Sequence, residues 1–180
     1  MPHDAVRSFE LGIAGLARAA DQLTDARDSD TIRALAVRAA RQMSAADGAA
    51  YVGALGGRVS CLAEDAVSPV RAGRDDALDR SLEAWCLGQR VPAAVEDVYR
   101  DARIPRADFS RTFVRSLAVV PIQLQPEADA LAVYWASRRL PSIEELELLE
   151  ALAEHVAAAL DRGRGPQRRT PGSSIPAFVV

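Results

Sequence analysis

Two short apolar segments joined by a polar connection constrain the fold of this chain more than any other feature. They are residues 116–124 and 130–136. Their length and their content of valine and aromatic residues are typical of strands rather than helices, so we expect a β-hairpin. Residues 117–120 are apolar at every position, which predicts a central strand buried on both faces. Pro121 then predicts a bulge or an edge, because proline donates no hydrogen bond to a neighbouring strand.

A second hairpin is predicted earlier in the chain. Residues 49–55 and 59–63 are strand-like, and the two glycines at 56–57 tolerate the backbone angles of a tight turn. Residues 91–95 predict one further short strand. Residues 64–76 lack periodicity and contain proline and glycine, so we expect a loop there.

Helical periodicity predicts four helices. The first covers residues 4–23, and the second follows a cap at Ser29 or Asp30. The third covers residues 77–87, and its expected inward residues are Leu78, Leu82, Trp85 and Cys86. The last covers residues 143–162, where Ser142 and Glu145 have the spacing of a capping box.

This arrangement predicts an α+β fold. We expect an antiparallel sheet of about five strands, with the N- and C-terminal helices packed on one face and the short helix plus loops on the other. With 180 residues, 49% of them hydrophobic, the chain suffices for one domain with tails. The expected division is an N-terminal dimerisation helix at 1–29, a domain at 30–162, and a disordered tail at 163–180 that is rich in Arg, Pro and Ser.

The order and spacing of several segments resemble a GAF domain. These segments are W-C-L-G-Q-R-V-P-A-A-V-E-D, D-A-R-I-P, R-S-L-A-V-V-P-I, A-L-A-V-Y-W-A and P-S-I-E-E-L-E-L-L-E-A-L-A-E-H-V-A-A-A-L. The resemblance covers roughly residues 30–162, and its Y-W-A ending resembles GAF modules attached to bacterial histidine kinases. It implies a GAF/PAS-like fold in which the face of the sheet covered by loops holds a ligand pocket.

Composition argues against several classes of protein. The formal net charge of -3 and the pI near 5.5 disfavour binding to nucleic acid, which normally requires a basic surface. The basic residues are all arginines, and they are scattered among acidic residues rather than clustered. No apolar run approaches the roughly 20 residues that span a bilayer, and the N-terminus lacks a signal-peptide pattern. We expect a cytoplasmic protein with free thiols.

Residues that could support catalysis are few. His155 is expected on the outer side of the last helix, and one histidine builds no metal site by itself. GAF proteins that attach a bilin usually place a histidine after the anchoring cysteine, whereas leucine follows both Cys61 and Cys86. GAF enzymes that reduce free methionine sulfoxide use a group of cysteines in their loops. We therefore expect no catalytic residue and no metal site, and both cysteines to be small buried hydrophobes. A cofactor is left open.

The candidate ligand-binding residues combine positive charge with aromatic faces. The arginines lie in or next to the long connection 99–113, and such connections are usually functional or mobile. The aromatic candidates other than Phe109 lie in the predicted helix 77–87 and strand 130–136. An arginine and an aromatic ring together suit an anionic or aromatic ligand. Strand alternation predicts that only one of Tyr134 and Trp135 faces inward, and it leaves open which one. Alternatively, Asp97 and Asp101 serve only to organise turns. The candidates are Trp85, Arg103, Phe109, Arg111, Arg115, Tyr134 and Trp135.

The expected function is that of a non-catalytic sensory or regulatory domain in bacterial signal transduction. It would act through its terminal helices on a fused or separate output domain, with a small-molecule ligand as one of its partners. One alternative is a dimerisation scaffold whose pocket is filled by its own side chains. Another is a redox enzyme of the methionine-sulfoxide-reductase type.

A parallel homodimer is also predicted, through residues 4–23 and 143–162. Both segments carry apolar residues spaced by three and four, which is typical of helix–helix seams. Alternatively, the first helix packs on its own domain. The two seams are Phe9, Ile13, Leu16, Ala20 and Leu23, and Leu146, Leu149, Ala153, Val156 and Leu160; the residues expected to face the sheet are Ile143, Leu152 and Ala157.

Overall fold

The structure is a computed structural model that describes residues 2–55, 58–71, 75–77, 81–125 and 128–164. The predicted glycine turn at 56–57 lies outside the described residues. The predicted disordered tail lies outside them as well from residue 165 onward.

The described strands form one sheet of six in the order β3-β2-β1-β6-β5-β4, with every neighbouring pair antiparallel. This confirms the predicted α+β class with one strand more than expected. The additional strand is β3, which covers the end of the segment predicted to be a loop and residue 77, where a helix was predicted to begin. The helix begins only at Leu82, and β2 extends further than expected. The strands are β1 (Gly48–Leu55), β2 (Arg58–Ala66), β3 (Asp75–Ala77), β4 (Ala93–Val95), β5 (Ser116–Ile122) and β6 (Asp129–Trp135).

The predicted hairpin of β5 and β6 lies at the centre of the fold. Its register runs without interruption from Ser116 opposite Trp135 to Ile122 opposite Asp129. Every residue of β5 is buried, as its apolar run predicted. Pro121 pairs opposite Ala130 without a bulge, but the ladder with β4 spans only residues 117–119. Pro121 therefore lies beyond that ladder, where a missing N–H costs the sheet nothing.

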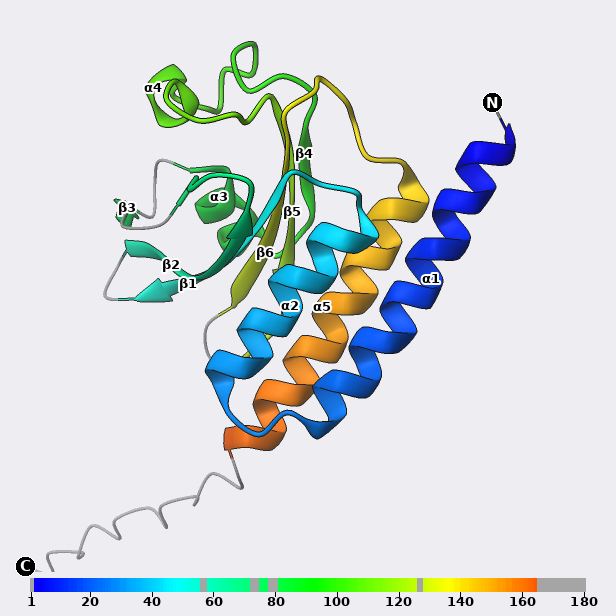
Figure 1. Cartoon of the computed structure of the whole chain (residues 1–180). Coiled ribbons are helices and arrows are strands. Elements are labelled where there is room, and N and C mark those ends of the chain that lie inside the picture. The colour runs from blue at the N-terminus through cyan, green and yellow to red at the C-terminus, as the bar shows by residue number, and fades with distance from the viewer. Residues whose placement is uncertain (1, 56–57, 72–74, 78–80, 126–127, 165–180) are drawn as a thin grey trace, which may run out of the picture.

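The long helices α2 (Ser29–Met43) and α5 (Ile143–Arg164) cover one face of the sheet, and α1 (Pro2–Asp25) packs on the outer side of these two helices. Figure 1 shows α1 and α5 running in the same direction, with α2 running the opposite way. The shorter α3 (Leu82–Gln89) and α4 (Arg106–Phe109) lie with the loops on the opposite face. Among the described helices, none combines the length and the apolar character needed to cross a membrane.

Local hydrogen bonds explain where two of these helices begin. Asp28 caps α2, because its carboxylate accepts from the backbone N–H of Thr31 at 2.8 Å, so the predicted cap at Ser29 or Asp30 is one or two residues late. The capping box of α5 is confirmed. The Ser142 N–H donates to Glu145 Oε2 at 2.8 Å, and the Glu145 N–H donates to Ser142 Oγ at 3.2 Å.

Two apolar cores lie on opposite faces of the sheet. We call the first the helix-side core; it packs strand residues such as Ala118, Val120 and Leu131 against α2 and α5. We call the second the loop-side core; it packs the alternate strand residues, such as Leu117 and Val119, against α3 and the long connections. Because successive strand residues point to opposite faces, each of the two central strands contributes to both cores.

The first helix packs on its own domain. Ala19 and Leu23 belong to the helix-side core, and a Cβ added to Gly12 would lie only 2.6 Å from Leu148 Cδ1 of α5. The N-terminal part of α1 remains more accessible, with Phe9 and Ile13 exposed. Of the predicted seam, Leu23 therefore packs on its own domain, and the homodimer stays a prediction.

The predicted seam of the last helix is not a free surface. Leu149, Ala153 and Val156 are buried in the helix-side core, because α5 is enclosed by α1, α2 and the sheet. Leu152 is also buried there, as expected of a sheet-facing residue. Ile143 was expected to face the sheet as well, but it is 72% exposed at the start of the helix.

Candidate functional site

A buried ion pair in the loop-side core is the main polar feature of the face covered by loops. Arg71 Nη2 lies 2.5 Å from Glu83 Oε1, and the side chains are 5% and 0% exposed. Arg71 follows β2 in the connection to β3, and Glu83 lies in the first turn of α3. Charged groups are rarely buried so completely unless they are paired, because removing a charge from water is costly.

Both partners are held by their local backbone. On β2, Glu64 Oε1 accepts the backbone N–H groups of Val70 at 2.7 Å and Arg71 at 2.9 Å, which fixes the loop that carries the arginine. Ser81 caps α3, because its hydroxyl accepts from the N–H of Ala84 at 3.0 Å. The acidic residue in the first turn of this helix is also favoured by the helix dipole.

Two aromatic residues complete the cluster. The Tyr134 hydroxyl on β6 donates to Glu83 Oε1 at 3.3 Å. The Arg71 guanidinium lies 5.6 Å from the ring centroid of Phe109 on α4, within the range of a cation–π interaction. The rings of Phe109 and Tyr134 are 6.4 Å apart at 52°. Burial, followed by the charge of Glu83, raises the pKa of the Tyr134 hydroxyl well above its usual value, so it acts as a neutral donor.

One oxygen of the buried carboxylate has no partner. Glu83 Oε1 accepts from both Arg71 and Tyr134, whereas Glu83 Oε2 is buried without any hydrogen bond. Buried oxygens of this kind are uncommon, because the lost hydration is not replaced. The cluster therefore has an unused acceptor in an apolar surrounding, which suits it to receive a hydrogen-bond donor.

The two cysteines border the same core. Burial raises the pKa of the Cys61 thiol to about 11 and that of the Cys86 thiol to about 12, with further contributions from Glu64 at Cys61 and from Glu83 at Cys86. Cys86 is fully buried, as predicted, whereas Cys61 is only partly buried. Thiols with a raised pKa are poor nucleophiles at neutral pH, because the thiolate is the reactive form. Among the described residues, no group of three or more potential metal ligands is arranged to hold an ion.

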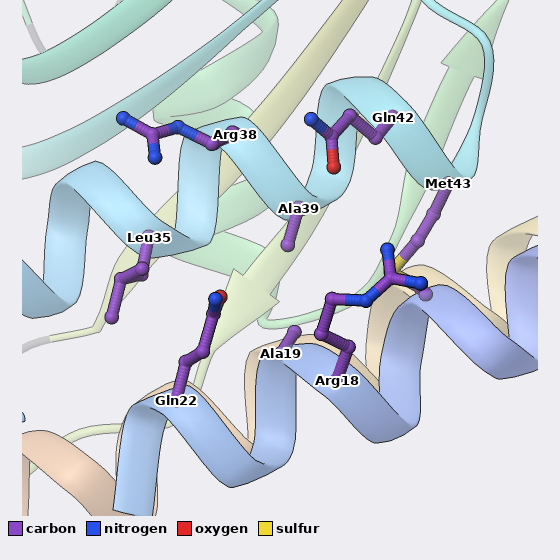
Figure 2. Close-up of a pocket in the computed structure, with 9 residues that line it drawn as sticks. Arg18, Ala19, Gln22, Leu35, Arg38, Ala39, Gln42 and Met43 are labelled. Atoms are coloured by element: carbon purple, nitrogen blue, oxygen red, sulfur yellow. The ribbon is translucent and has the colours of Figure 1, made fainter. Parts of the chain in front are cut away.

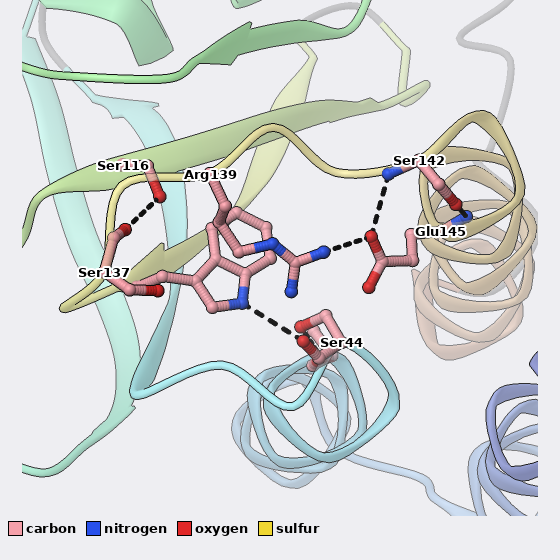
Figure 3. Close-up of polar contacts among 8 residues, drawn as sticks. Ser44, Ser116, Ser137, Arg139, Ser142 and Glu145 are labelled. Atoms are coloured by element: carbon pink, nitrogen blue, oxygen red, sulfur yellow. Dashed lines mark hydrogen bonds and ion pairs between the residues drawn. The ribbon is translucent and has the colours of Figure 1, made fainter. Parts of the chain in front are cut away.

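The structure separates the two neighbouring aromatic candidates on β6. Tyr134 faces the loop-side core, and Trp135 faces the helix-side core. The indole N–H of Trp135 donates to the Ser44 carbonyl at 3.1 Å, at the end of α2. Arg139 lies over its ring at 4.6 Å and bonds Glu145 of the α5 capping box (Figure 3). The prediction that Trp135 lines a pocket on the loop side is therefore wrong, because strand alternation directs its side chain to the helices.

The remaining candidates lie mostly at the surface. Phe109 is buried against the ion pair, but Trp85 is 41% exposed on the outer side of α3, contrary to its predicted inward position. The three arginine candidates are exposed. Arg103 pairs with Asp101 at 2.6 Å, and Arg115 pairs with Asp97 at 3.2 Å while lying over the Tyr99 ring.

These pairs match the alternative prediction, in which the acidic residues organise turns. Asp97 and Asp101 each accept a backbone N–H two residues further along the chain. Arg111 is exposed as well. His155 is exposed on α5, as expected for a surface histidine.

A small cavity lies elsewhere, between α1 and α2 (Figure 2). It measures about 20 Å³, which is space for about one water molecule. It is on the helical side of the sheet, and thus across the sheet from the ion pair. Its lining residues are Gly15, Arg18, Ala19, Gln22, Leu35, Arg38, Ala39, Gln42 and Met43.

The chain belongs to the GAF domain family. A family model described as a GAF domain matches residues 26–161, which excludes most of α1. A comparison with curated proteins found no significant match.

Solved structures of GAF domains share the fold. The GAF domain of a phosphoenolpyruvate-protein phosphotransferase from Coxiella burnetii is 16% identical, with a TM-score of 0.76 over 87% of this chain and 96% of that one. The free methionine-R-sulfoxide reductase of Neisseria meningitidis, solved with its substrate, is 12% identical, with a TM-score of 0.76 over 87% and 92%. The GAF domain of the cyanobacteriochrome TePixJ is 19% identical, with a TM-score of 0.66 over 79% and 95%. Proteins with this fold thus include a phosphotransferase, a reductase and a cyanobacteriochrome.

Sequence reasoning missed the two residues that form the ion pair. Arg71 lies in an aperiodic segment, and Glu83 lies in a helix that is otherwise apolar, L-E-A-W-C-L-G-Q. A single acidic residue within such a helix was the available signal, because buried charges are normally paired.

Proposed function

We propose that this GAF domain is a non-catalytic sensory or regulatory module that binds a small ligand in its loop-side core. The observation that supports ligand binding is the buried pair of Arg71 and Glu83, with Tyr134 donating to one carboxylate oxygen and the other oxygen unused. Well-packed apolar residues often give at least as much stability as a buried ion pair, so structure alone gives little reason for this cluster. Recognition of a polar ligand would be a reason for burying these charged groups.

The proposal extends to how the domain is used. It acts in the cytoplasm within bacterial signal transduction, of the kind associated with histidine kinases, and passes its signal through α1 and α5 to a fused or separate output domain. The helix-side contacts of Trp135 support the part of this route that leads to α5. Its β6 neighbour Tyr134 contacts Glu83, while Trp135 contacts the end of α2 and lies against Arg139, which bonds Glu145 at the start of α5.

Two observations bear on the alternatives. The raised pKa values of Cys61 and Cys86 disfavour a thiol-based reductase, and the similarity to the Neisseria enzyme concerns the fold alone. The scaffold alternative is favoured by the dense packing of the loop-side core, in which the domain's own side chains, such as Phe109 and Leu117, fill the space beneath the loops.

A thermal-shift screen of small metabolites tests the ligand. A ligand present at 100 times its dissociation constant stabilises the folded state by about 2.7 kcal/mol, which is a rise of several degrees in Tm for a domain of this size. The rise should shrink strongly in Glu83→Gln and Tyr134→Phe and persist in Arg111→Ala, which alters an exposed arginine. If no metabolite binds, or all variants respond equally, the scaffold alternative is favoured. Methionine-sulfoxide turnover that disappears in Cys86→Ser would contradict the non-catalytic assignment.

A homodimer through the terminal helices forms part of the proposal. The accessible apolar residues on this side are Phe9, Leu11 and Ile13 of α1, Leu140 in the connection before α5, and Ile143 at the start of α5. Phe9→Glu with Ile13→Glu should convert a dimer to a monomer in light scattering. Val91→Glu, at an exposed apolar residue near α3, is the matched control and should not. A wild-type protein that remains monomeric at high micromolar concentration would contradict the dimer.

A further inference from the structure

We propose that the Arg71 side chain occupies a receptor site for a small organic cation, and that a ligand bearing a guanidinium or ammonium group competes with it for Glu83. This inference rests on the proposed function, since it assigns a chemical class to the ligand of the loop-side core. It differs from the anionic or aromatic ligand expected from the surface arginines.

The residues around the Arg71 guanidinium form a receptor for a cation. Glu83 supplies a carboxylate 2.5 Å from Arg71 Nη2, and Phe109 supplies an aromatic ring 5.6 Å from the guanidinium carbon. The Tyr134 hydroxyl donates a hydrogen bond to this carboxylate. A carboxylate beside an aromatic face is a common environment for guanidinium and ammonium groups. The three receptor residues come from α3, α4 and β6, whereas the guanidinium comes from a connecting loop.

The resident guanidinium uses the carboxylate incompletely. A guanidinium can bind both oxygens of a carboxylate through two parallel N–H···O bonds. Arg71 reaches Oε1 through Nη2, while Oε2 remains without a donor. The backbone of Arg71 is tied to Glu64, which limits how the side chain can approach. A ligand without this tether can orient itself to donate to both oxygens, which gives it an advantage over the resident group.

Charge selects a cation over other ligand classes. If an incoming cation replaces the Arg71 guanidinium, the buried Glu83 carboxylate keeps a positive partner throughout. An anion entering the same position would face the carboxylate of Glu83, and a neutral group would leave Glu83 buried without a compensating charge. Uncompensated buried charges are strongly destabilising. The site therefore tolerates replacement of the Arg71 guanidinium by another cation, but not by an anion or a neutral group.

Chemical rescue tests the inference directly. In Arg71→Ala the receptor residues remain but the resident cation is lost, so Tm should fall. Methylguanidinium chloride at about 10 mM should then restore Tm in a saturable manner, because binding only to the folded state raises stability with ligand concentration. Wild-type protein, whose site is filled, should respond at least about tenfold more weakly at the same concentration. Sodium chloride at equal ionic strength should not restore Tm.

A double variant assigns the rescue to the carboxylate. Arg71→Ala with Glu83→Gln removes the negative charge, and its Tm should not respond to methylguanidinium. If Arg71→Ala does not fold, Arg71→Met retains the apolar stem and is used in its place, paired with Arg71→Met/Glu83→Gln. Equal rescue of single and double variants, or no rescue of either single variant, overturns the inference.

Failure of the cation assignment and failure of the proposed function give different results. A non-cationic metabolite that stabilises wild-type protein through Glu83 would uphold ligand binding and overturn the cation assignment. Conversely, a metabolite screen that finds nothing for wild-type protein would count against the proposed function, while Glu83-dependent rescue of the arginine variant would still support a cation receptor.

Discussion

Replacing Leu23 by alanine tests whether α1 is part of the folded domain. Leu23 is 1% exposed in the helix-side core, although it lies outside the residues matched by the family model. Leucine-to-alanine changes at buried sites cost about 2–5 kcal/mol, and less where the surroundings can collapse into the cavity. Because Leu23 lies in the last turns of an outer helix, we expect about 2–3 kcal/mol. For a domain of this size, that corresponds to a fall in Tm of about 4–12 °C.

Ile13→Ala is the matched control on the same helix. Ile13 is 47% exposed, so its truncation in a monomer should change the free energy of unfolding by no more than about 0.5 kcal/mol. Both variants should be unfolded in urea at two protein concentrations tenfold apart, because the stability of a dimer depends on concentration. A cost below about 1 kcal/mol for Leu23→Ala would refute the packing of α1 on its own domain. A concentration-dependent loss at Ile13 would instead support the dimer.

Three further predictions concern other parts of the domain. Ser142→Ala should lower stability by about 0.5–2 kcal/mol in thermal denaturation through loss of the α5 cap, and Ser142→Asp should restore most of it. The pKa of the Cys61 thiol is raised to about 11 from an ordinary 9.0, so at pH 8 about a hundredfold less of it is thiolate. Its alkylation, followed by mass spectrometry, should therefore be slow and should accelerate as pH rises. Cys86 should react more slowly still, and rapid labelling of Cys86 would contradict its burial. Trp135→Phe should cost about 1–3 kcal/mol, because the Ser44 carbonyl loses its indole donor, yet it should leave any ligand-induced shift in Tm unchanged.

The fold could be predicted because its signals are local and mutually consistent. Turn residues separate β1 from β2 and β5 from β6, and helical spacing marks α1, α2 and α5. The short β3 could not be predicted, because three residues, Asp-Asp-Ala, carry no apolar alternation and pair only through their position beside β2. The burial of the α5 seam was also missed. Apolar residues spaced by three and four indicate a packed face, but the spacing does not say whether the same chain or a second copy covers it.

The local sequence also does not reveal which face of the sheet each side chain of β6 occupies. Alternation of polar and apolar residues normally reveals which face of a strand is buried, but residues 130–135 are buried on both faces. The pattern of residues therefore does not show which of Tyr134 and Trp135 faces the loops. The choice depends on distant partners: the Ser44 carbonyl for the indole, and Glu83 for the hydroxyl. Partners separated by 91 and 51 positions leave no pattern in the local sequence.

The position of Glu83 on α3 reverses the usual preference of side chains for core and solvent. This helix buries its acidic residue and exposes Trp85, although burial of a large aromatic side chain is favourable. At about 100° per residue, the other buried residues flank Glu83 on both sides, whereas Trp85 lies about 200° away from it. Those residues are Leu82, Ala84, Cys86 and Leu87. Glu83 is therefore at the centre of the buried face, and rotating the helix to bury Trp85 would expose apolar neighbours. The carboxylate is held inside by the packing of those neighbours, so it requires a cationic partner at all times, whether that partner is Arg71 or a ligand.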